Sequence, residues 1–243
     1  MRYAFVSDIH SNLEALDAVL TCLRREAIDR YFHVGDIVGY GADPAACIAK
    51  IRALDCIGVG GNHDWACVEK TSAADFNPMA REAVLWTQGV LNAEQLQFLK
   101  SLQPVYTCED LALVHGSLDE PDAFHYILNA SGAMETLRLM RTRLCCIGHS
   151  HAPMIASLDP KGKLYFHRDA KVAMAEEGYR YLVNVGSVGQ PRDGDPRAAY
   201  AIYDTKDSTV EVKRVAYDIP TAQRKIVQAG LPPVLAARLS EGW

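Results

Sequence analysis

Residues 2–36 read RYAFVSDIHSNLEALDAVLTCLRREAIDRYFHVGD and determine the fold that the sequence predicts. The apolar run Arg2–Ser7 predicts a buried strand, and apolar residues at helical spacing predict a helix over Leu13–Ala27. A second apolar run, Tyr31–Val34, predicts another strand. Strand, helix and strand in this order indicate a right-handed βαβ unit and a largely parallel sheet.

The same alternation continues along the chain. We expect a helix over Pro44–Leu54, a strand over Cys56–Gly60 and a helical hairpin over Phe76–Leu102, broken near residues 89–92. From Val105 onward the sequence is rich in short strand candidates: Leu111–His115, Leu144–Gly148, Met154–Leu158, Lys163–His167, Tyr181–Val185, Ala199–Asp204 and Thr209–Val215. Turn sequences such as DPKGK and DTKDS join some of them and favour antiparallel hairpins.

These elements together predict one α/β domain over residues 1–243, built from two stacked, mixed sheets flanked by helices. From Pro220 the last ~25 residues are expected to form a helical tail with one or two short helices, and Gly230 is expected to end a helix there. A chain of 243 residues that is 49% hydrophobic and 23% charged is long enough for one large core.

The net charge of -5 gives no basic surface that would attract nucleic acid through its phosphates. Nucleic acid is therefore not indicated as a partner except as a substrate, because metal ions can supply local positive charge. Oligomeric state cannot be inferred from these residues.

The cysteines indicate the compartment. There are seven, with no CxxC pair, which predicts free thiols in a reducing environment rather than disulfides. The N-terminus reaches Asp8 and His10 too soon for a signal peptide, and no apolar run approaches the roughly 18 residues of a membrane span. We expect a cytoplasmic protein with no membrane partner.

Polar residues cluster where the predicted strands give way to loops, and glycines adjoin most of them. These residues are Asp8, His10, Asp36, Asn62, His63, His115, His149 and His151. Strand ends are where α/β proteins place their ligand sites, so the loops are expected to converge on one edge of the fold.

The chemistry of this set indicates metal ions. All the donors are N or O, which suits Mn, Fe, Zn or Ni and argues against a structural cysteine-zinc site. Seven ligands that share one carboxylate suit two divalent ions about 3.5–4 Å apart. Each piece alone has a simpler explanation: GD is commonly a turn, NHD a polar loop, and HxH two residues of a surface strand. Five such pieces in one order at strand ends favour the metal site.

The series SDIH, GDIVGYG, GGNHD, LVHGS and GHSH resembles the motifs of the calcineurin-like metallophosphoesterase superfamily, in its small bacterial branch. The run NVGSVGQPRDGDPRAAY resembles a later segment of that branch, which usually has Pro where Val185 stands here. The resemblance implies a four-layer α/β/β/α sandwich. It also implies one ion on Asp8, His10 and His151, a second on Asn62, His115 and His149, and Asp36 bridging the two.

The resemblance further implies hydrolysis of phosphate esters by attack of a metal-bridging hydroxide on phosphorus. His63, next to the ligand Asn62, would act as the general acid that protonates the leaving oxygen.

Departures from related Ser/Thr protein phosphatases narrow the expected substrate. Those enzymes carry GDxVDRG and RGNHE, whereas Gly39 here replaces the Asp that orients the catalytic His, and Tyr40 and Gly60 replace two phosphate-clamping arginines. Without guanidinium forks a dianionic monoester loses its bidentate grip. We therefore expect a small phosphate-ester substrate, with a phosphodiester preferred over a monoester. The alternatives are a phosphomonoesterase or protein phosphatase of the same fold, or a catalytically silent protein-binding scaffold, although His63 is retained.

Three further residues are candidates for substrate binding. Arg192 could rebuild part of a phosphate-binding surface, although its segment could equally be a turn before the next strand. Asn12 could contact a phosphate, but capping of the following helix is the favoured role for Asn at this position. Tyr40 could line the pocket.

Overall fold

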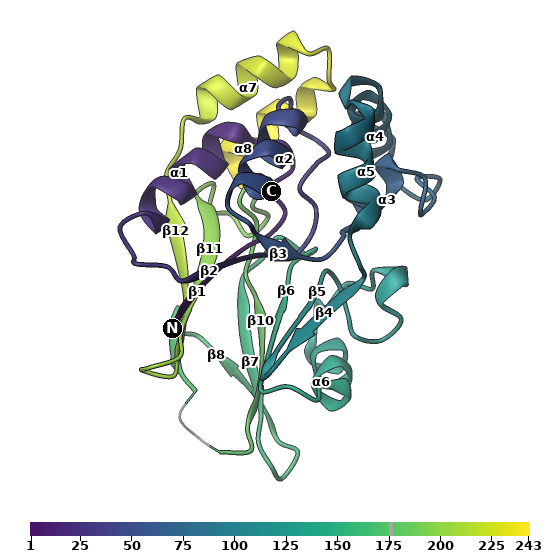
Figure 1. Ribbon diagram of the computed structural model, residues 1–243. Coiled ribbons are helices and arrows are strands. Elements are labelled where there is room, and N and C mark those ends of the chain that lie inside the picture. Colours follow the sequence, from purple (N-terminus) through teal and green to yellow (C-terminus); the bar gives the residue numbers. More distant parts are fainter. Residues whose placement is uncertain (175–176) are drawn as a thin grey trace.

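The computed structural model describes residues 1–174 and 177–243, which form two six-stranded sheets flanked by helices (Figure 1). The strand order is β3-β2-β1-β11-β12-β9 in the first sheet and β4-β5-β6-β10-β7-β8 in the second. The predicted pair of stacked, mixed sheets is therefore confirmed.

The βαβ unit expected at the N-terminus forms one half of the first sheet. β1 (Arg2–Val6), β2 (Arg30–His33) and β3 (Ile57–Gly58) are parallel neighbours, connected by α1 (Leu13–Leu23) and α2 (Pro44–Ala53). The predicted extension of α1 to Ala27 is wrong, because Leu23 is the last residue whose side chain the helix buries.

Antiparallel strands complete the first sheet. β11 (Ala198–Asp204) pairs with β1, β12 (Thr209–Val215) pairs with β11, and β9 (Lys171–Ala173) pairs with β12. The DTKDS sequence is the turn between β11 and β12, as the sequence predicts. The sequence patterns do not predict β9.

In the second sheet, β5, β6 and β10 are parallel and the outer strands are antiparallel. Its hairpin between β7 and β8 turns through DPKGK, again as predicted, whereas β4 has no counterpart among the predicted strands. The strands are β4 (Val105–Cys108), β5 (Leu111–Val114), β6 (Leu144–Ile147), β7 (Met154–Leu158), β8 (Leu164–His167) and β10 (Arg180–Asn184).

The remaining helices surround the sheets. The predicted helical hairpin is α4 and α5, and it breaks at Asn92, whose side chain forms a capping box with Gln95. The expected C-terminal helices are α7 and α8, whereas the sequence patterns predict neither α3 nor α6. The helices are α3 (Asn62–Cys67), α4 (Pro78–Val90), α5 (Ala93–Ser101), α6 (Ala130–Leu139), α7 (Ile219–Gln228) and α8 (Pro233–Glu241), with a 3₁₀ turn at Pro121–Ala123.

Apolar side chains form separate layers on the faces of the sheets. Between the sheets, Phe5 and Phe32 stack with ring centroids 5.3 Å apart and belong to one cluster with residues of the second sheet such as Cys146. Cys145, the preceding residue, points to the opposite face and joins the cluster that α6 covers through Leu137. With α1 and α2 covering the first sheet, the order is helix, sheet, sheet, helix (Figure 1).

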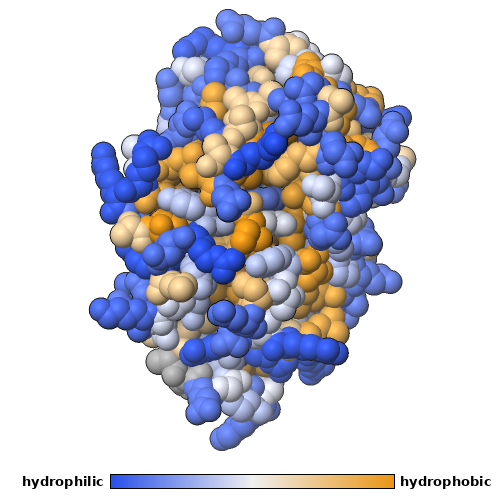
Figure 2. Space-filling model, in the orientation of Figure 1, coloured by the Kyte–Doolittle hydropathy of each residue, from blue (hydrophilic) through white to orange (hydrophobic). Residues whose placement is uncertain are grey.

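Surface properties agree with a folded domain whose apolar residues are mostly internal. Hydrophilic residues cover the two ends of the face in Figure 2, and hydrophobic residues show mainly between them. The described chain has no helix with the length and apolar character needed to cross a membrane. All seven cysteines are free thiols.

Candidate metal centre

Side chains from both sheets meet at the edge where parallel strands end. Asp8 and His10 follow β1, Asp36 follows β2, Asn62 begins α3 after β3, His115 follows β5, and His149 and His151 follow β6. All of these except Asn62 are buried, and Asn62 is half-buried. The convergence expected from the sequence therefore occurs.

The backbone at these residues is unusual. Asp8, His10, Asp36, His149 and His151 all have positive φ angles, between 48° and 66°. Non-glycine residues in this left-handed region cost of order 1–3 kcal/mol each and persist only where the surrounding structure enforces them. Five such residues at one site indicate that the loops are shaped to aim these side chains.

Hydrogen bonds between neighbouring loops hold this shape. The Asp8 N–H donates to the Gly35 carbonyl and the His10 N–H to the Asp36 carbonyl, both at 3.0 Å. The His149 N–H donates to the Asp8 carboxylate at 3.0 Å, which ties the second sheet to the first.

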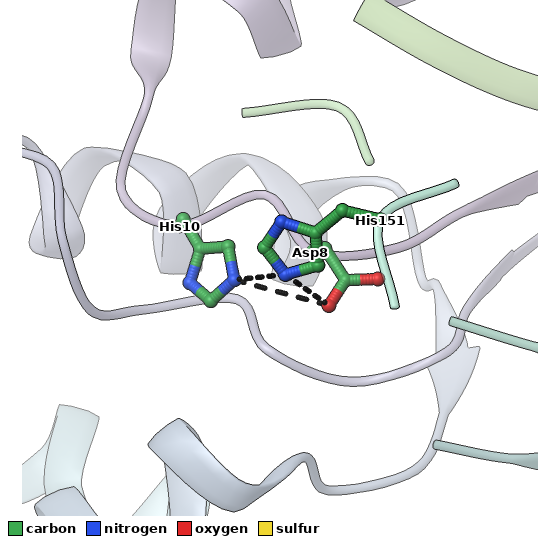
Figure 3. A group of neighbouring side chains, drawn as sticks. All are labelled: Asp8, His10 and His151. Carbon is green, nitrogen blue, oxygen red and sulfur yellow. Dashed lines mark hydrogen bonds and ion pairs between the residues drawn. The ribbon is translucent and has the colours of Figure 1, made fainter. Parts of the chain in front are cut away.

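Asp8, His10 and His151 form a first cluster (Figure 3). The Nδ1 atoms of His10 and His151 donate to the carbonyls of Val38 (3.0 Å) and Gln190 (2.6 Å), which leaves their Nε2 atoms as acceptors. These two Nε2 atoms are 3.0 Å apart, and the Nε2 of His151 is 3.2 Å from an Asp8 oxygen. Lone pairs so close together repel unless a cation or a proton lies between them.

Asp36, His115 and His149 form a second cluster. The Nδ1 of His115 donates to the Val34 carbonyl at 2.7 Å, so its Nε2 faces the Asp36 carboxylate, 3.2 Å away. Within the described chain, Nε2 of His115, Nε2 of His149 and Oδ1 of Asn62 are buried without a hydrogen bond. Buried polar atoms are normally satisfied, and these three are the kind of donor that binds a divalent ion.

Asp36 lies between the two clusters. Its Oδ2 is 3.6 Å from Nε2 of His10 and 3.2 Å from Nε2 of His115, so one carboxylate reaches both sets of ligands. Its other oxygen accepts the His63 N–H at 2.9 Å.

The electrostatics of the site favour cations. Burial by itself would raise the pKa of Asp8 and of Asp36, but the neighbouring histidines outweigh it and lower both values, so both carboxylates are ionised. Burial lowers the pKa of His149 to about 3, which keeps the ring neutral, as a ligand must be. Burial also disfavours charge on His115, but Asp36 and Asp8 raise its pKa to about 9, so a metal ion would compete with a proton for its Nε2.

His63 is buried, 4% exposed, and lies with His10 and Asp36 in a third group of side chains close enough together to hold an ion. The rings of Tyr40, Phe76 and His10 surround it at centroid distances of 4.5, 4.8 and 4.9 Å, and its Nδ1 has no hydrogen bond within the described chain. A Cβ added to Gly39 would lie 2.5 Å from that Nδ1. Aromatic packing and the Gly39 backbone therefore hold the ring, with no carboxylate on Nδ1.

Arg192 is a basic side chain at the edge of this group. Its Nη2 donates to Oε1 of Gln190 at 2.8 Å and to the Tyr40 hydroxyl at 3.3 Å. The pKa of His63 and of His151 is lowered chiefly by burial and also by the charge of Arg192. The structure thus brings Arg192 and Tyr40 together next to the histidines.

Asn12 has a structural role. Its Oδ1 accepts the Ala15 N–H at 3.1 Å and caps α1, while its Nδ2 donates to the Gly189 carbonyl at 2.9 Å. Both ends of the side-chain amide are therefore engaged in holding loops together, in keeping with the capping role that its position favours.

Three residues that hold the ligand loops in place are not predicted by the sequence patterns. Asn184 donates to the Gly148 carbonyl at 2.7 Å, Ser187 donates to the Asp8 carbonyl at 2.7 Å, and Asp64 accepts the N–H groups of Val38 and Gly61. Asn184 and Ser187 belong to the run NVGSVGQP, whose density of Gly, Asn and Ser after a strand is the signal that could have found them.

A sandwich of two sheets that gathers N and O donors of both sheets at one edge is the architecture of a metallophosphoesterase. A family model described as the calcineurin-like phosphoesterase superfamily domain matches residues 1–208, so the chain belongs to that superfamily. Its members depend on two metal ions, and the Asp and His clusters described above are able to hold them.

Three proteins are similar to this one over almost the whole chain. An uncharacterized protein of Methanocaldococcus jannaschii is 41% identical over 244 residues, covering 98% of this chain and 97% of its own. The crystal structure of a metallophosphoesterase from Sphaerobacter thermophilus is 40% identical, covers both chains completely and superposes with a TM-score of 0.87. A hypothetical protein from Pyrococcus horikoshii, 20% identical over 100% of this chain and 98% of its own, shares the fold with a TM-score of 0.81.

Proposed function

We propose that this protein is a phosphoesterase that hydrolyses small phosphate esters with two divalent ions. Asp8, His10 and His151 would hold one ion. The other ion would be held by Asn62, His115 and His149, and Asp36 would contact both ions. The observation that carries the proposal is the set of buried ligand atoms gathered at one site without hydrogen bonds, among them Oδ1 of Asn62 and Nε2 of His149. When bound, the ions supply an activated water and neutralise charge on the phosphoryl oxygens.

His63 is the residue proposed to pass a proton to the leaving oxygen. Burial lowers its pKa to about 4, against the opposing effect of Asp36, so the ring is neutral at pH 7 without substrate. A bound phosphate anion raises this pKa and allows the ring to carry the second proton that a general acid needs.

The lining of the site supports a phosphodiester over a monoester. Gly60 cannot be replaced by a phosphate-clamping arginine without a rearrangement, because a Cβ there would lie within 2.2 Å of Trp65 Nε1. Arg192 is shared with Gln190 and Tyr40, which leaves one guanidinium where the protein phosphatases have two. A diester carries one negative charge less than a monoester dianion and therefore needs fewer cations.

The test compares bis-p-nitrophenyl phosphate with p-nitrophenyl phosphate on metal-stripped protein, before and after addition of Mn²⁺, Fe²⁺, Ni²⁺ or Zn²⁺. Metal-dependent turnover that favours the diester is the expected result. A preference for the monoester would keep the phosphoesterase and reject the diester specificity. Absence of turnover with every ion would favour the alternative of a protein-binding scaffold.

The role of His63 is tested with His63→Gln. Both metals should remain bound, while turnover of an alkyl phosphodiester falls by about 10²–10⁴, the usual contribution of positioned proton transfer. His167→Gln is the matched control, because His167 lies on β8 and its ring contacts Ser157. Full activity of His63→Gln on the alkyl ester would disprove the role.

A further inference from the structure

A pocket of about 430 Å³ opens directly beside the candidate metal centre. Asn62, His63 and His149 form its floor, so the pocket and the metal centre share side chains. Its walls come from two segments, residues 71–77 between α3 and α4 and residues 122–126 between β5 and α6. Figure 1 shows both segments on the side of the molecule that carries α3.

The buried floor of the pocket carries polar atoms without partners. Nδ1 of His63 and Nε2 of His149 have no hydrogen bond within the described chain, and the two side chains are only 4% and 5% exposed. His149 is a proposed metal ligand and Nδ1 of His63 lies against Gly39, so this end of the pocket is the candidate metal centre itself. Because His63 is the proposed proton donor to the leaving oxygen, the group that enters the pocket is the leaving alcohol.

Aromatic rings make up much of the walls. Tyr126 stacks on the His149 ring at a centroid distance of 3.8 Å and an angle of 18°, and Phe76 packs against His63. Tyr40 and Phe124 add two more rings. Aromatic faces favour flat rings and cations as neighbours.

The charged side chains that line the pocket are acidic, and Arg192 lies beside its Tyr40 and Tyr126 rings. Asp75 and Asp122 are exposed carboxylates at the pocket, and no lysine or arginine is found among the described residues that line it. Neither carboxylate takes part in an ion pair in the described chain. Lys70 is near Asp122, but its Nζ donates to the Leu102 carbonyl and lies over the Trp65 ring.

We propose that this pocket binds the leaving alcohol of the ester and selects an aromatic alcohol that is cationic or uncharged over one that is anionic. The proposal rests on the proposed phosphoesterase function and adds the substrate's charge to it. The phosphate lies on the metal side with Arg192, and the organic part lies between the rings under Asp75 and Asp122. A second phosphate or carboxylate on that organic part would face both aspartates.

The test uses three ethyl aryl phosphodiesters whose leaving phenols carry a para 2-aminoethyl, ethyl or 2-carboxyethyl group. The substituents change the charge of the leaving group from positive to neutral to negative while changing the acidity of the phenol little. Released phenol is measured chromatographically with the metal-loaded full-length protein. The cationic ester should have a kcat/KM about tenfold above that of the anionic ester, with the neutral ester between them, as expected for unit charges a few ångströms from a carboxylate in water.

The variants Asp75→Asn and Asp122→Asn, singly and together, remove the selecting charge and keep the shape. The double variant should bring the ratio of cationic to anionic ester close to one. Glu82→Gln is the control, because Glu82 is an exposed carboxylate on α4 that does not line the pocket and should leave the ratio unchanged.

The outcomes separate the two proposals. Metal-dependent turnover of all three esters at equal rates would overturn the charge selection and keep the phosphoesterase. A ratio that survives in the double variant would also overturn it, because the selection would then come from elsewhere. Failure of all three esters with every metal would reject the proposed function itself.

Discussion

Substitution of Gly39 by alanine tests how His63 is held. Gly39 has φ of +92°, and a Cβ at this position would lie 2.5 Å from Nδ1 of His63 and 3.0 Å from its Cγ. Ordinary contacts between such atoms begin near 3.4 Å. The imidazole must therefore move by about 1 Å, and the rings of Tyr40 and Phe76, which pack against its other sides, restrict where it can go.

The expected loss follows from the displacement. A misplacement of about 1 Å in a catalytic group costs about 10²-fold in rate. Gly39→Ala should therefore lower kcat on an alkyl phosphodiester by about a hundredfold, and lower it less on a p-nitrophenyl ester, whose leaving group needs no proton. The metal content should stay at the wild-type value, because Gly39 is not among the candidate ligands.

The backbone strain of the substitution is controlled by Gly162→Ala. Gly162 has φ of +83°, close to that of Gly39, but no atom lies within 4 Å of an added Cβ. Both variants share the cost of placing alanine at positive φ, about 1–3 kcal/mol. Activity is measured with both esters, and stability by thermal unfolding. Wild-type kcat of Gly39→Ala on the alkyl ester would refute the argument that this contact positions His63.

Three other predictions concern stability. Burial lowers the pKa of His33 from 6.5 to about 4, so below pH 6.5 the unfolded chain binds a proton that the folded protein does not, and the folded state loses stability as the pH falls towards 4. In denaturant titrations, the free energy of unfolding of His33→Leu relative to wild type should therefore rise by about 2 kcal/mol between pH 7.5 and pH 5, because the 1.5 pH units between the ordinary pKa of 6.5 and pH 5 correspond to that amount. A difference in unfolding free energy that does not change with pH would contradict this. Metal-stripped protein should unfold at a lower temperature, and Mn²⁺ at about 1,000 times its Kd should raise the Tm by about 10 °C, from about 4 kcal/mol of binding linkage; an unchanged Tm in calorimetry would count against the site. Asn12→Ala should lose about 1 kcal/mol through the lost α1 cap and the bond to Gly189, with unchanged metal content; loss of metal instead would assign Asn12 to the centre.

The sequence predicts the elements whose signal is local and strong. Apolar runs of the right length identify β1, β5 and β6, and polar residues at their ends identify candidate ligands. Helix α3 escapes prediction because its six residues, NHDWAC, are also the ligand motif and show no helical periodicity. Strand β9 has three residues and exists through its pairing with β12.

The contacts that support the site could not be predicted from sequence patterns, for a different reason. The acceptors for Nδ1 of His10, His115 and His151 are backbone carbonyls, and every residue has one. Which carbonyl lies under which ring depends on how the loops pack. Similarly, the rings around His63 come from separate segments, and nothing in the local sequence around Phe76 connects it to the motif GGNHD.

The division of the candidate ligands between the two sheets has a consequence for how the centre assembles. Asp8, His10 and Asp36 belong to the first sheet and His115, His149 and His151 to the second, and His10 and His151 are 141 residues apart in the chain. The first cluster needs His151 and the second needs His115 and His149, so neither of these two sets of donors is complete until the sheets have docked. Packing of one sheet on the other is therefore the step that would bring each of these ligand sets together.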